Sequence, residues 1–260
     1  MDPQRRQPRA ASRKPHNSSM AHATLSPARR SALESLASDL RRIFGNRLYS
    51  VCAYGEPASD DGETRSIVLV DHLSFHDLAA CVPLARTWDA RGLAVPLILE
   101  RDEFARTLDV FPLEYGEIIA DHVHVFGDNP FEGLRVAEAD LRRGCELQAK
   151  SHLIHLREGF LETGGDARAV ARLIGASAQG FNRLLTNIVQ LVGGHEAGDD
   201  HEDLAGAAER HIGVPADLTR EVLAGAGAGP STIADPTALL ARYIGAVERL
   251  WELVDTWKRA

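Results

Sequence analysis

The sequence has few of the residues that build a disulfide framework or span a membrane. It contains only three cysteines, Cys52, Cys81 and Cys145, which are widely spaced and lie in apolar, periodic segments. This usage predicts reduced thiols in a protein core and a cytoplasmic location, because disulfide frameworks belong to oxidising compartments. The longest wholly apolar runs extend for only a few residues, too short for a transmembrane helix. We therefore expect no membrane partner.

Several motifs for nucleotide or hydrolase chemistry are also absent. No G-x-G-x-x-G follows a predicted strand and no G-x-x-x-x-G-K-[ST] occurs, which argues against dinucleotide and P-loop sites. No G-x-S-x-G elbow is present for a serine hydrolase. The histidine pairs His122/His124 and His152/His155 lack a third ligand of recognised type, so the sequence assigns no metal site to them.

Basic residues are scarce outside the N-terminal segment. Residues 1–30 hold seven Lys or Arg against one acid, whereas the remaining 230 residues hold 22 basic and 36 acidic residues. A body this acidic repels phosphate backbones, so we do not expect nucleic acid as a partner. Residues 1–25 are basic and poor in apolar side chains, which predicts a disordered tail.

From Ser26 onward the pattern alternates between helices and strands. Ser26 and Pro27 predict the start of a helix whose apolar stripe ends at Gly45. Short runs rich in β-branched or apolar residues and bounded by turn formers predict strands from Leu48, Ser66, Ala94 and Val123. A helix between Ser74 and Gly92, kinked at Pro83, is expected to bury Leu78, Val82, Ala85 and Trp88.

After Pro130 the pattern is helical only. One long helix, with Ile154 among its core positions, is expected to end at Gly164; a second begins after Asp166, and a last one begins at Asp235-Pro236. The acidic segment 195–203 is expected to be an exposed loop. We therefore predict an α/β domain with a small mixed sheet over residues 26–130, followed by an all-α helical bundle over residues 131–260.

The segment YGEPASDDGETRSIVLVD, residues 54–71, places a glycine and a polar loop between two predicted strands. It resembles the minimal nucleotidyltransferase family, in which a glycine and a serine follow the first strand. In that family a pair of aspartates, separated by one residue, leads into the second strand, and a third carboxylate lies on a later strand. The segments 109–118 (DVFPLEYGEI) and 141–166 resemble a bacterial two-domain branch of this family with a C-terminal HEPN-like helical domain.

The chain departs from the family pattern at the positions that carry chemistry. Gly55 matches the family glycine, but Glu56 replaces the serine, and Thr64, Arg65 and Ser66 stand where the aspartate pair is expected. Two-metal phosphoryl chemistry needs closely spaced oxygen ligands, which these residues do not supply. The leading hypothesis is a nucleotidyltransferase-fold protein that has lost catalysis and acts as a binding or regulatory module without a cofactor. Its candidate ligand-binding residues are Gly55, Glu56, Arg65 and Glu100.

Two alternatives stay open from the sequence. In the first, Asp60, Asp61, Glu63 and Asp71 hold Mg²⁺ in an altered geometry, and the protein transfers a nucleoside monophosphate from a nucleoside triphosphate to a small molecule or protein. In the second, the chain is one component of a two-protein complex, with the helical domain as the interface. The sequence leaves open a nucleotide or small-molecule ligand, a homo-oligomer and a protein partner.

Overall fold

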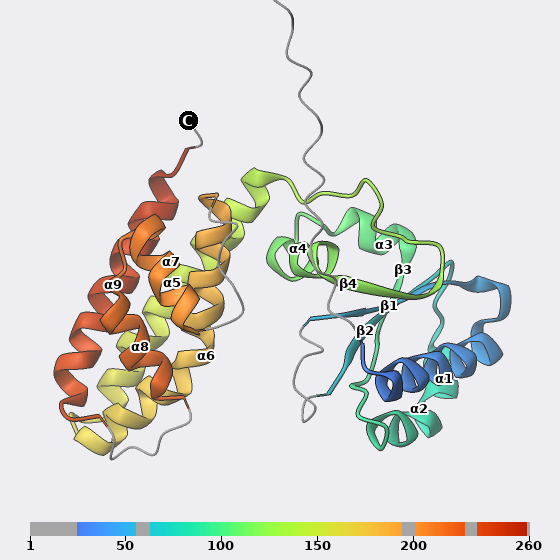
Figure 1. Cartoon of the computed structure of the whole chain (residues 1–260), viewed down its shortest axis with the longest axis horizontal. Helices are drawn as coiled ribbons and strands as arrows, with labels where there is room; N and C mark the ends of the chain where they lie inside the picture. The colour runs from blue at the N-terminus through green and yellow to red at the C-terminus, as the bar shows by residue number, and fades with distance from the viewer. Residues whose placement is uncertain (1–24, 56–62, 194–200, 227–232, 259–260) are drawn as a thin grey trace, which may run out of the picture.

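The computed structural model describes residues 25–55, 63–193, 201–226 and 233–258, which form two halves (Figure 1). A four-stranded sheet flanked by helices makes up one half, and helices alone make up the other. The predicted tail, residues 1–25, lies outside the described residues except for Leu25, which is buried. No helix within the described ranges is long and apolar enough to cross a membrane.

The sheet mixes parallel and antiparallel pairs in the order β3, β2, β1, β4. The strands are β1 (Leu48–Tyr54), β2 (Arg65–Val70), β3 (Leu97–Glu100) and β4 (His122–Gly127). Strand β1 pairs antiparallel with both β2 and β4, and β2 pairs parallel with β3. This pairing sets Tyr54 opposite Arg65 at the end of the sheet where β1 stops and β2 begins. The predicted small mixed sheet is confirmed.

Helices cover both faces of the sheet (Figure 1). They are α1 (Pro27–Phe44) and α2 (Phe75–Asp89) on one face, and α3 (Arg101–Arg106) and α4 (Pro112–Ala120) on the other. The α1 helix begins as predicted, because the Ser26 side chain accepts a hydrogen bond from the Arg29 backbone N–H. The buried Trp88 donates its indole N–H to Asp39 at 3.0 Å, which ties α2 to α1.

The buried face of α2 differs from the prediction. Leu78 and Val82 are 40% and 70% exposed, whereas Asp77, Cys81 and Trp88 are buried. The carboxylate of Asp77 accepts two hydrogen bonds from the Arg47 guanidinium and also binds the Ser74 backbone N–H. These contacts hold the first turn with its acid inward, so the apolar stripe is rotated toward solvent. The prediction that Ile154 is a core residue is also wrong. The buried side of its helix includes the neighbouring Leu153, whereas Ile154 is 41% exposed.

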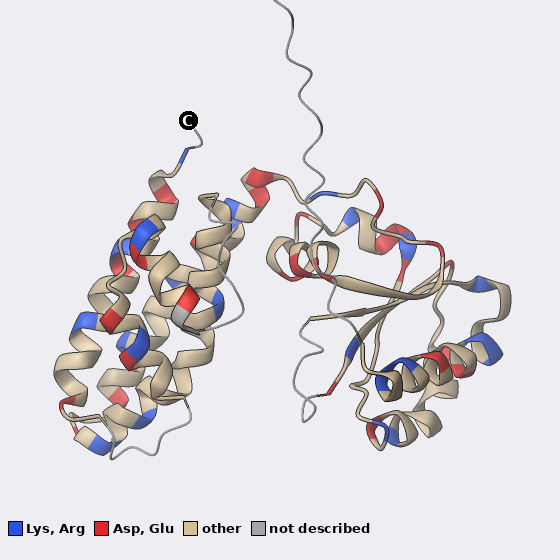
Figure 2. Ribbon diagram, viewed as in Figure 1, with Lys and Arg blue, Asp and Glu red and all other residues tan. Residues whose placement is uncertain are grey.

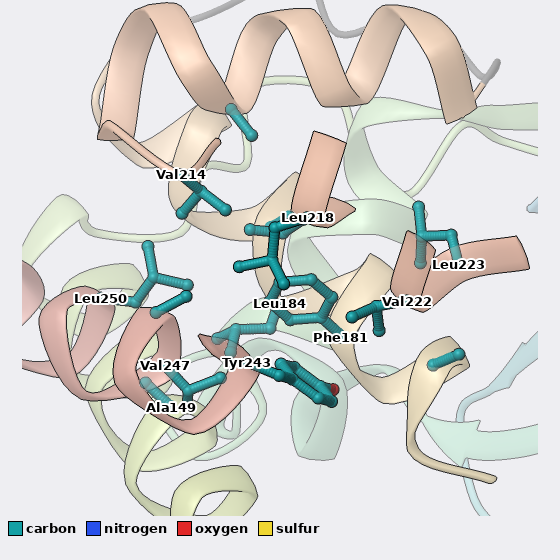
Figure 3. Close-up of a cluster of buried hydrophobic side chains, with 14 of the residues drawn as sticks. Ala149, Phe181, Leu184, Val214, Leu218, Val222, Leu223, Tyr243, Val247 and Leu250 are labelled. Carbon is teal, nitrogen blue, oxygen red and sulfur yellow. The ribbon is translucent and has the colours of Figure 1, made fainter. Parts of the chain in front are cut away.

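The helical half surrounds one hydrophobic core (Figure 3). Its helices are α5 (Glu138–Glu162), α6 (Ala167–Leu191), α7 (His201–Ile212), α8 (Ala216–Ala224) and α9 (Pro236–Thr256). Phe181 and Tyr243 lie at the centre, with ring centroids 4.6 Å apart in an edge-to-face arrangement. Asp166 and Asp235 cap α6 and α9 at the predicted starts.

The helices α7 and α8 are not predicted by the sequence pattern. The acidic segment 195–203 was expected to be a loop, but its last three residues begin α7; residues 195–200 lie outside the described part of the chain. Ala205, Ala207 and Ala208 form much of the buried face of α7. Alanine gives little hydrophobic contrast, so a helix that buries mainly alanine leaves a weak periodic signal.

Helix α4 joins the two halves. Tyr115 and Ile118 pack in the sheet core, while α4 also contacts α5. Gly144 of α5 lies so close to α4 that a Cβ there would stand 3.0 Å from side-chain atoms of both Pro112 and Leu113. The connection from β4 to α5 packs against the sheet half, because Phe131 is buried in the same core as Tyr115.

Candidate functional site

The candidate site lies where β1 ends and β2 begins. The strands of the sheet carry almost no Lys, Arg, Asp or Glu; the exceptions are Arg65 at the start of β2 and Glu100 at the end of β3 (Figure 2). Residues 56–62 connect β1 to β2 and include the predicted Glu56, Asp60 and Asp61, which lie outside the described residues. Gly55 and Arg65 flank this connection, so the structure brings these two predicted ligand-binding residues together.

Gly55 is required by its backbone and by its contact with Arg65. Its φ is +73°, in the left-handed region that favours glycine. A Cβ at position 55 would lie 2.2 Å from Nη2 of Arg65, so the guanidinium occupies the space that any larger residue would need. The same guanidinium stands over the Tyr54 ring, with Cζ 5.1 Å from the centroid. The guanidinium of Arg65 therefore lies beside the Gly55 backbone and over the Tyr54 ring.

Two buried hydroxyls flank Arg65. Thr64 and Ser66 are 3% and 1% exposed, and their hydroxyl oxygens have no hydrogen-bond partner among the described residues. Thr64 lines a cavity of about 10 Å³ together with Tyr54, Gly55 and His122. A cavity of this size has room for about one water molecule. It is far too small to hold a nucleotide.

Two charged residues outside the sheet, Glu117 and Arg183, belong to the electrostatic surroundings of this end of the sheet. Glu117 of α4 is exposed as a residue, yet its neighbours remove part of its hydration, and this raises the pKa of its carboxyl. Arg183 of α6 and Arg65 of β2 both oppose that rise electrostatically. An acid on α4 is therefore flanked by cations from the helical half and from the sheet. Tyr54, beneath Arg65, has a raised pKa because its hydroxyl is desolvated.

The sequence pattern does not single out Glu117 or Arg183. Glu117 comes within electrostatic range of both Arg65 and Arg183 only through the packing of α4 and α6, which no local spacing predicts. Glu117 lies within the segment 109–118 that carries the family resemblance, and this was the available signal for it. The sequence offers no such signal for Arg183, because arginine is common on the exposed side of an amphipathic helix.

The predicted residues Asp71 and Glu100 lie at the other end of the sheet. Glu100 Oε1 accepts a hydrogen bond from the Leu73 backbone N–H at 2.8 Å and lies 2.9 Å from His72 Nδ1. That backbone hydrogen bond is the main cause that lowers the pKa of Glu100. Asp71 pairs with Arg101 at 3.5 Å. Both acids thus have partners that hold the loop between β2 and α2, and neither faces Gly55.

The acids proposed for a relocated metal site do not converge. Glu63 and Asp71 stand before and after β2, eight residues apart along an extended strand, which corresponds to roughly 25 Å. One ion cannot bind both. Within the described ranges, no group of three or more His, Cys, Asp or Glu side chains is placed to hold a metal ion. One histidine of each pair has a different partner within the fold. His122 lies 3.1 Å from the Ile119 carbonyl oxygen, and His152 lies 2.5 Å from the Tyr243 hydroxyl.

The mixed sheet, the glycine turn at the end of its first strand and the following helical half occur together in a solved structure of nucleotidyltransferase-like fold. The crystal structure of spectinomycin adenyltransferase AAD(9) from Enterococcus faecialis, with ATP and spectinomycin, is similar to this chain with a TM-score of 0.50. The similarity covers 85% of this chain and 98% of that chain at 12% sequence identity, so it establishes the fold alone. No family model matches the sequence. No curated protein matches it either.

Proposed function

We propose that this protein is a nucleotidyltransferase-fold protein that does not transfer nucleotides and acts as a binding or regulatory module. The observation that carries the proposal is Arg65, a positive charge at the entry to β2 that lies beside Gly55 and over the Tyr54 ring. Enzymes that use two metal ions hold them with closely spaced carboxylates, which neutralise the attacking and leaving oxygens. A guanidinium in this place repels a divalent cation, whereas it attracts the phosphate groups that the cation would otherwise bind.

A nucleotide is the ligand class that the fold favours. The similar structure was determined with ATP and spectinomycin, and its name describes an adenyltransferase. This observation also favours the competing function, a metal-dependent nucleotidyltransferase that uses Asp60, Asp61 and Glu63 at the Gly55 end of the sheet. The two functions differ in whether pyrophosphate is released.

The test is a turnover assay on the full chain. ATP, GTP, CTP and UTP are each supplied with Mg²⁺ and with spectinomycin or a small panel of aminocyclitols as acceptors, and pyrophosphate release is followed. We expect no release above the rate without protein. Sustained release would overturn the proposal in favour of the enzyme. Alanine at Asp60, Asp61 or Glu63 should then abolish turnover, while Asp71→Ala, at the far end of β2, is the matched control that should retain it.

We further interpret the helical half as an HEPN-like bundle that serves as an interaction module rather than a ribonuclease. Three long helices, α5, α6 and α9, pack around a single core, which supports a bundle. The sequence has no arginine, polar residue and histidine at the spacing of the HEPN nuclease motif. Incubation of the full chain with labelled single-stranded RNA should leave the RNA intact.

A further inference from the structure

The helical half exposes a row of large apolar side chains on one helix. Among its described residues, the exposed large apolar side chains are Leu147, Ile154 and Leu161 of α5, which are 71%, 41% and 78% exposed. They are seven residues apart, which is almost two turns of a helix, so they lie along one line of α5. Leucine and isoleucine at this spacing form the contact line of a coiled coil. An apolar line with polar residues around it indicates a site where another helix packs.

Two opposite charges complete this line. Lys150 and Glu158 stand four residues before and four residues after Ile154, on the same side of α5 as the apolar residues. We call Leu147, Lys150, Ile154, Glu158 and Leu161 the α5 seam. Its successive spacings are three, four, four and three residues, so the spacing is the same when the seam is read in either direction.

The α5 seam is complementary to a second copy of itself that runs in the opposite direction. About a two-fold axis at Ile154, each residue faces the residue at the equal distance beyond Ile154 in the other copy. Leu147 then faces Leu161, and Lys150 faces Glu158, so apolar residues meet apolar residues and each cation meets an acid. A parallel arrangement would place Lys150 against Lys150 and Glu158 against Glu158, which repel each other.

The contacts of the charged residues are compatible with this pairing. Lys150 Nζ lies 3.5 Å from the centroid of the Trp251 ring of α9, which positions the amine without neutralising its charge. The Glu158 side chain is 64% exposed and lies 3.6 Å from His155 Nδ1 on the same helix. Arg157, a second cation beside the seam, is already paired with a glutamate of α9. The acid that faces Lys150 in the antiparallel arrangement is therefore accessible.

We propose that the α5 seam is the contact surface of a homodimer in which two α5 helices pack antiparallel about a two-fold axis at Ile154. The inference deepens the interpretation of the helical half as an interaction module and rests on it, and it names a second copy of this chain as the partner. From Leu147 to Leu161 the seam is about 21 Å long. It is small beside the roughly 20–30 residues a side of a standard interface, so we expect a reversible dimer that forms at micromolar concentrations.

Sedimentation equilibrium of the full chain tests the dimer. We expect the mean mass to rise from 28.3 kDa toward twice that value as the protein concentration is raised to about 500 µM. Ile154→Glu should weaken self-association about tenfold or more, because it places two carboxylates opposite each other at the two-fold axis. Val82→Glu is the matched control, since Val82 is 70% exposed on α2, and it should leave the dissociation constant unchanged.

Charge reversal tests the antiparallel direction. Lys150→Glu and Glu158→Lys should each weaken self-association, because each variant puts like charges opposite each other at two places. An equimolar mixture of the two variants should regain the wild-type affinity, since every acid then faces a lysine of the other variant. Lys150→Glu also removes the contact with Trp251, so far-UV circular dichroism on each variant checks that the fold is retained.

Four outcomes would overturn the inference. They are a mass that stays at 28.3 kDa up to about 500 µM, a dimer that Ile154→Glu leaves unchanged, charge reversals that do not weaken it, and a mixture that does not regain the affinity. The proposed function is judged separately, because pyrophosphate release or RNA cleavage by the wild-type chain would overturn it whether or not the dimer forms. A monomer that shows neither activity would overturn the homodimer alone.

Discussion

The His152 side chain is the clearest case in which one residue links burial to a measurable property. It is half-buried at the edge of the core of the helical half, where Nε2 is 2.5 Å from the Tyr243 hydroxyl and its ring stacks on Phe181. Burial, with a smaller effect from the nearby His155, lowers the pKa of His152 to about 4. The imidazole is therefore neutral in the folded protein at neutral pH.

This lowered pKa predicts a loss of stability in mild acid. The unfolded chain binds a proton at His152 near pH 6.5, whereas the folded chain does so only near pH 4, so the stabilising contribution is complete above pH 6.5. It should disappear as the pH falls through this interval, lowering the free energy of unfolding by up to about 3 kcal/mol. Urea unfolding at pH 7 and pH 4.5 measures the change.

His152→Phe should remove most of this pH dependence, even if it lowers stability at pH 7 by breaking the hydrogen bond to Tyr243. The matched control is His211→Phe, since His211 is exposed on α7, and this variant should keep the acid-induced loss. An unchanged pH dependence in His152→Phe would show that other groups cause it.

At the scale of elements, α6 and α8 approach closely at a pair of glycines. A Cβ at Gly175 of α6 would lie 2.7 Å from the carbonyl oxygen of Gly225, the C-cap residue that follows α8. Backbone atoms cannot rotate away as a side-chain tip can. The closeness of these two helices thus depends on the missing methyl group at position 175.

Gly175→Ala should destabilise the protein by about 1–3 kcal/mol through overpacking, in spite of the higher helix propensity of alanine. Gly245→Ala is the matched control, because Gly245 is also inside a helix but its nearest neighbour is 3.6 Å from the added Cβ. That variant should be neutral or stabilising by up to about 1 kcal/mol. Thermal unfolding followed by circular dichroism compares them, and equal effects in both would contradict the packing argument.

The elements that the sequence predicts well are those with strong local signals. Ser26, Asp166 and Asp235 cap helices through side-chain hydrogen bonds, and such caps depend only on residues nearby in the chain. The rotation of α2 is not local, because it follows from the contact of Asp77 with Arg47, thirty residues earlier. Tertiary contacts of this kind decide which side of a helix is buried.

At the scale of the whole molecule, the halves have separate cores. The core of the helical half contains Phe181 and Tyr243, whereas Trp88 belongs to a core formed by α1, α2 and one face of the sheet. The division into domains at residue 130 stays a prediction, and unfolding experiments can test it. The chain has three tryptophans, of which Trp251 and Trp257 can be replaced by phenylalanine to leave Trp88 as the only reporter.

In this background, Phe181→Ala should lower the midpoint temperature of the unfolding transition followed by far-UV circular dichroism. This signal mainly reports the helical half. Truncating a fully buried phenylalanine costs about 3–5 kcal/mol. The transition seen by Trp88 fluorescence should stay where it was. Leu36→Ala is the reciprocal control, because Leu36 of α1 lies in the same buried cluster as Trp88. This variant should lower the midpoint temperature of the Trp88 fluorescence transition. Coincident shifts of both signals in both variants would mean that the halves unfold as one unit.

The sequence predicts only some of the residues of the candidate site. Gly55 and Arg65 follow from the pattern of a strand, a glycine and a second strand, since antiparallel pairing sets the two ends together. Glu117 and Arg183 come within electrostatic range of each other because α4 and α6 pack where they do, and packing between elements leaves no spacing to recognise. Asp71 was a plausible partner only while the direction of β2 was ignored, because an extended strand carries it away from Gly55.

The contact between α4 and α5 makes one short helix a link between the two halves. Glu117 belongs to the same nine-residue helix whose first turn, at Pro112 and Leu113, fits against Gly144. A side chain larger than glycine at position 144 would press on this first turn, so it would disturb the attachment of the helical half to the sheet.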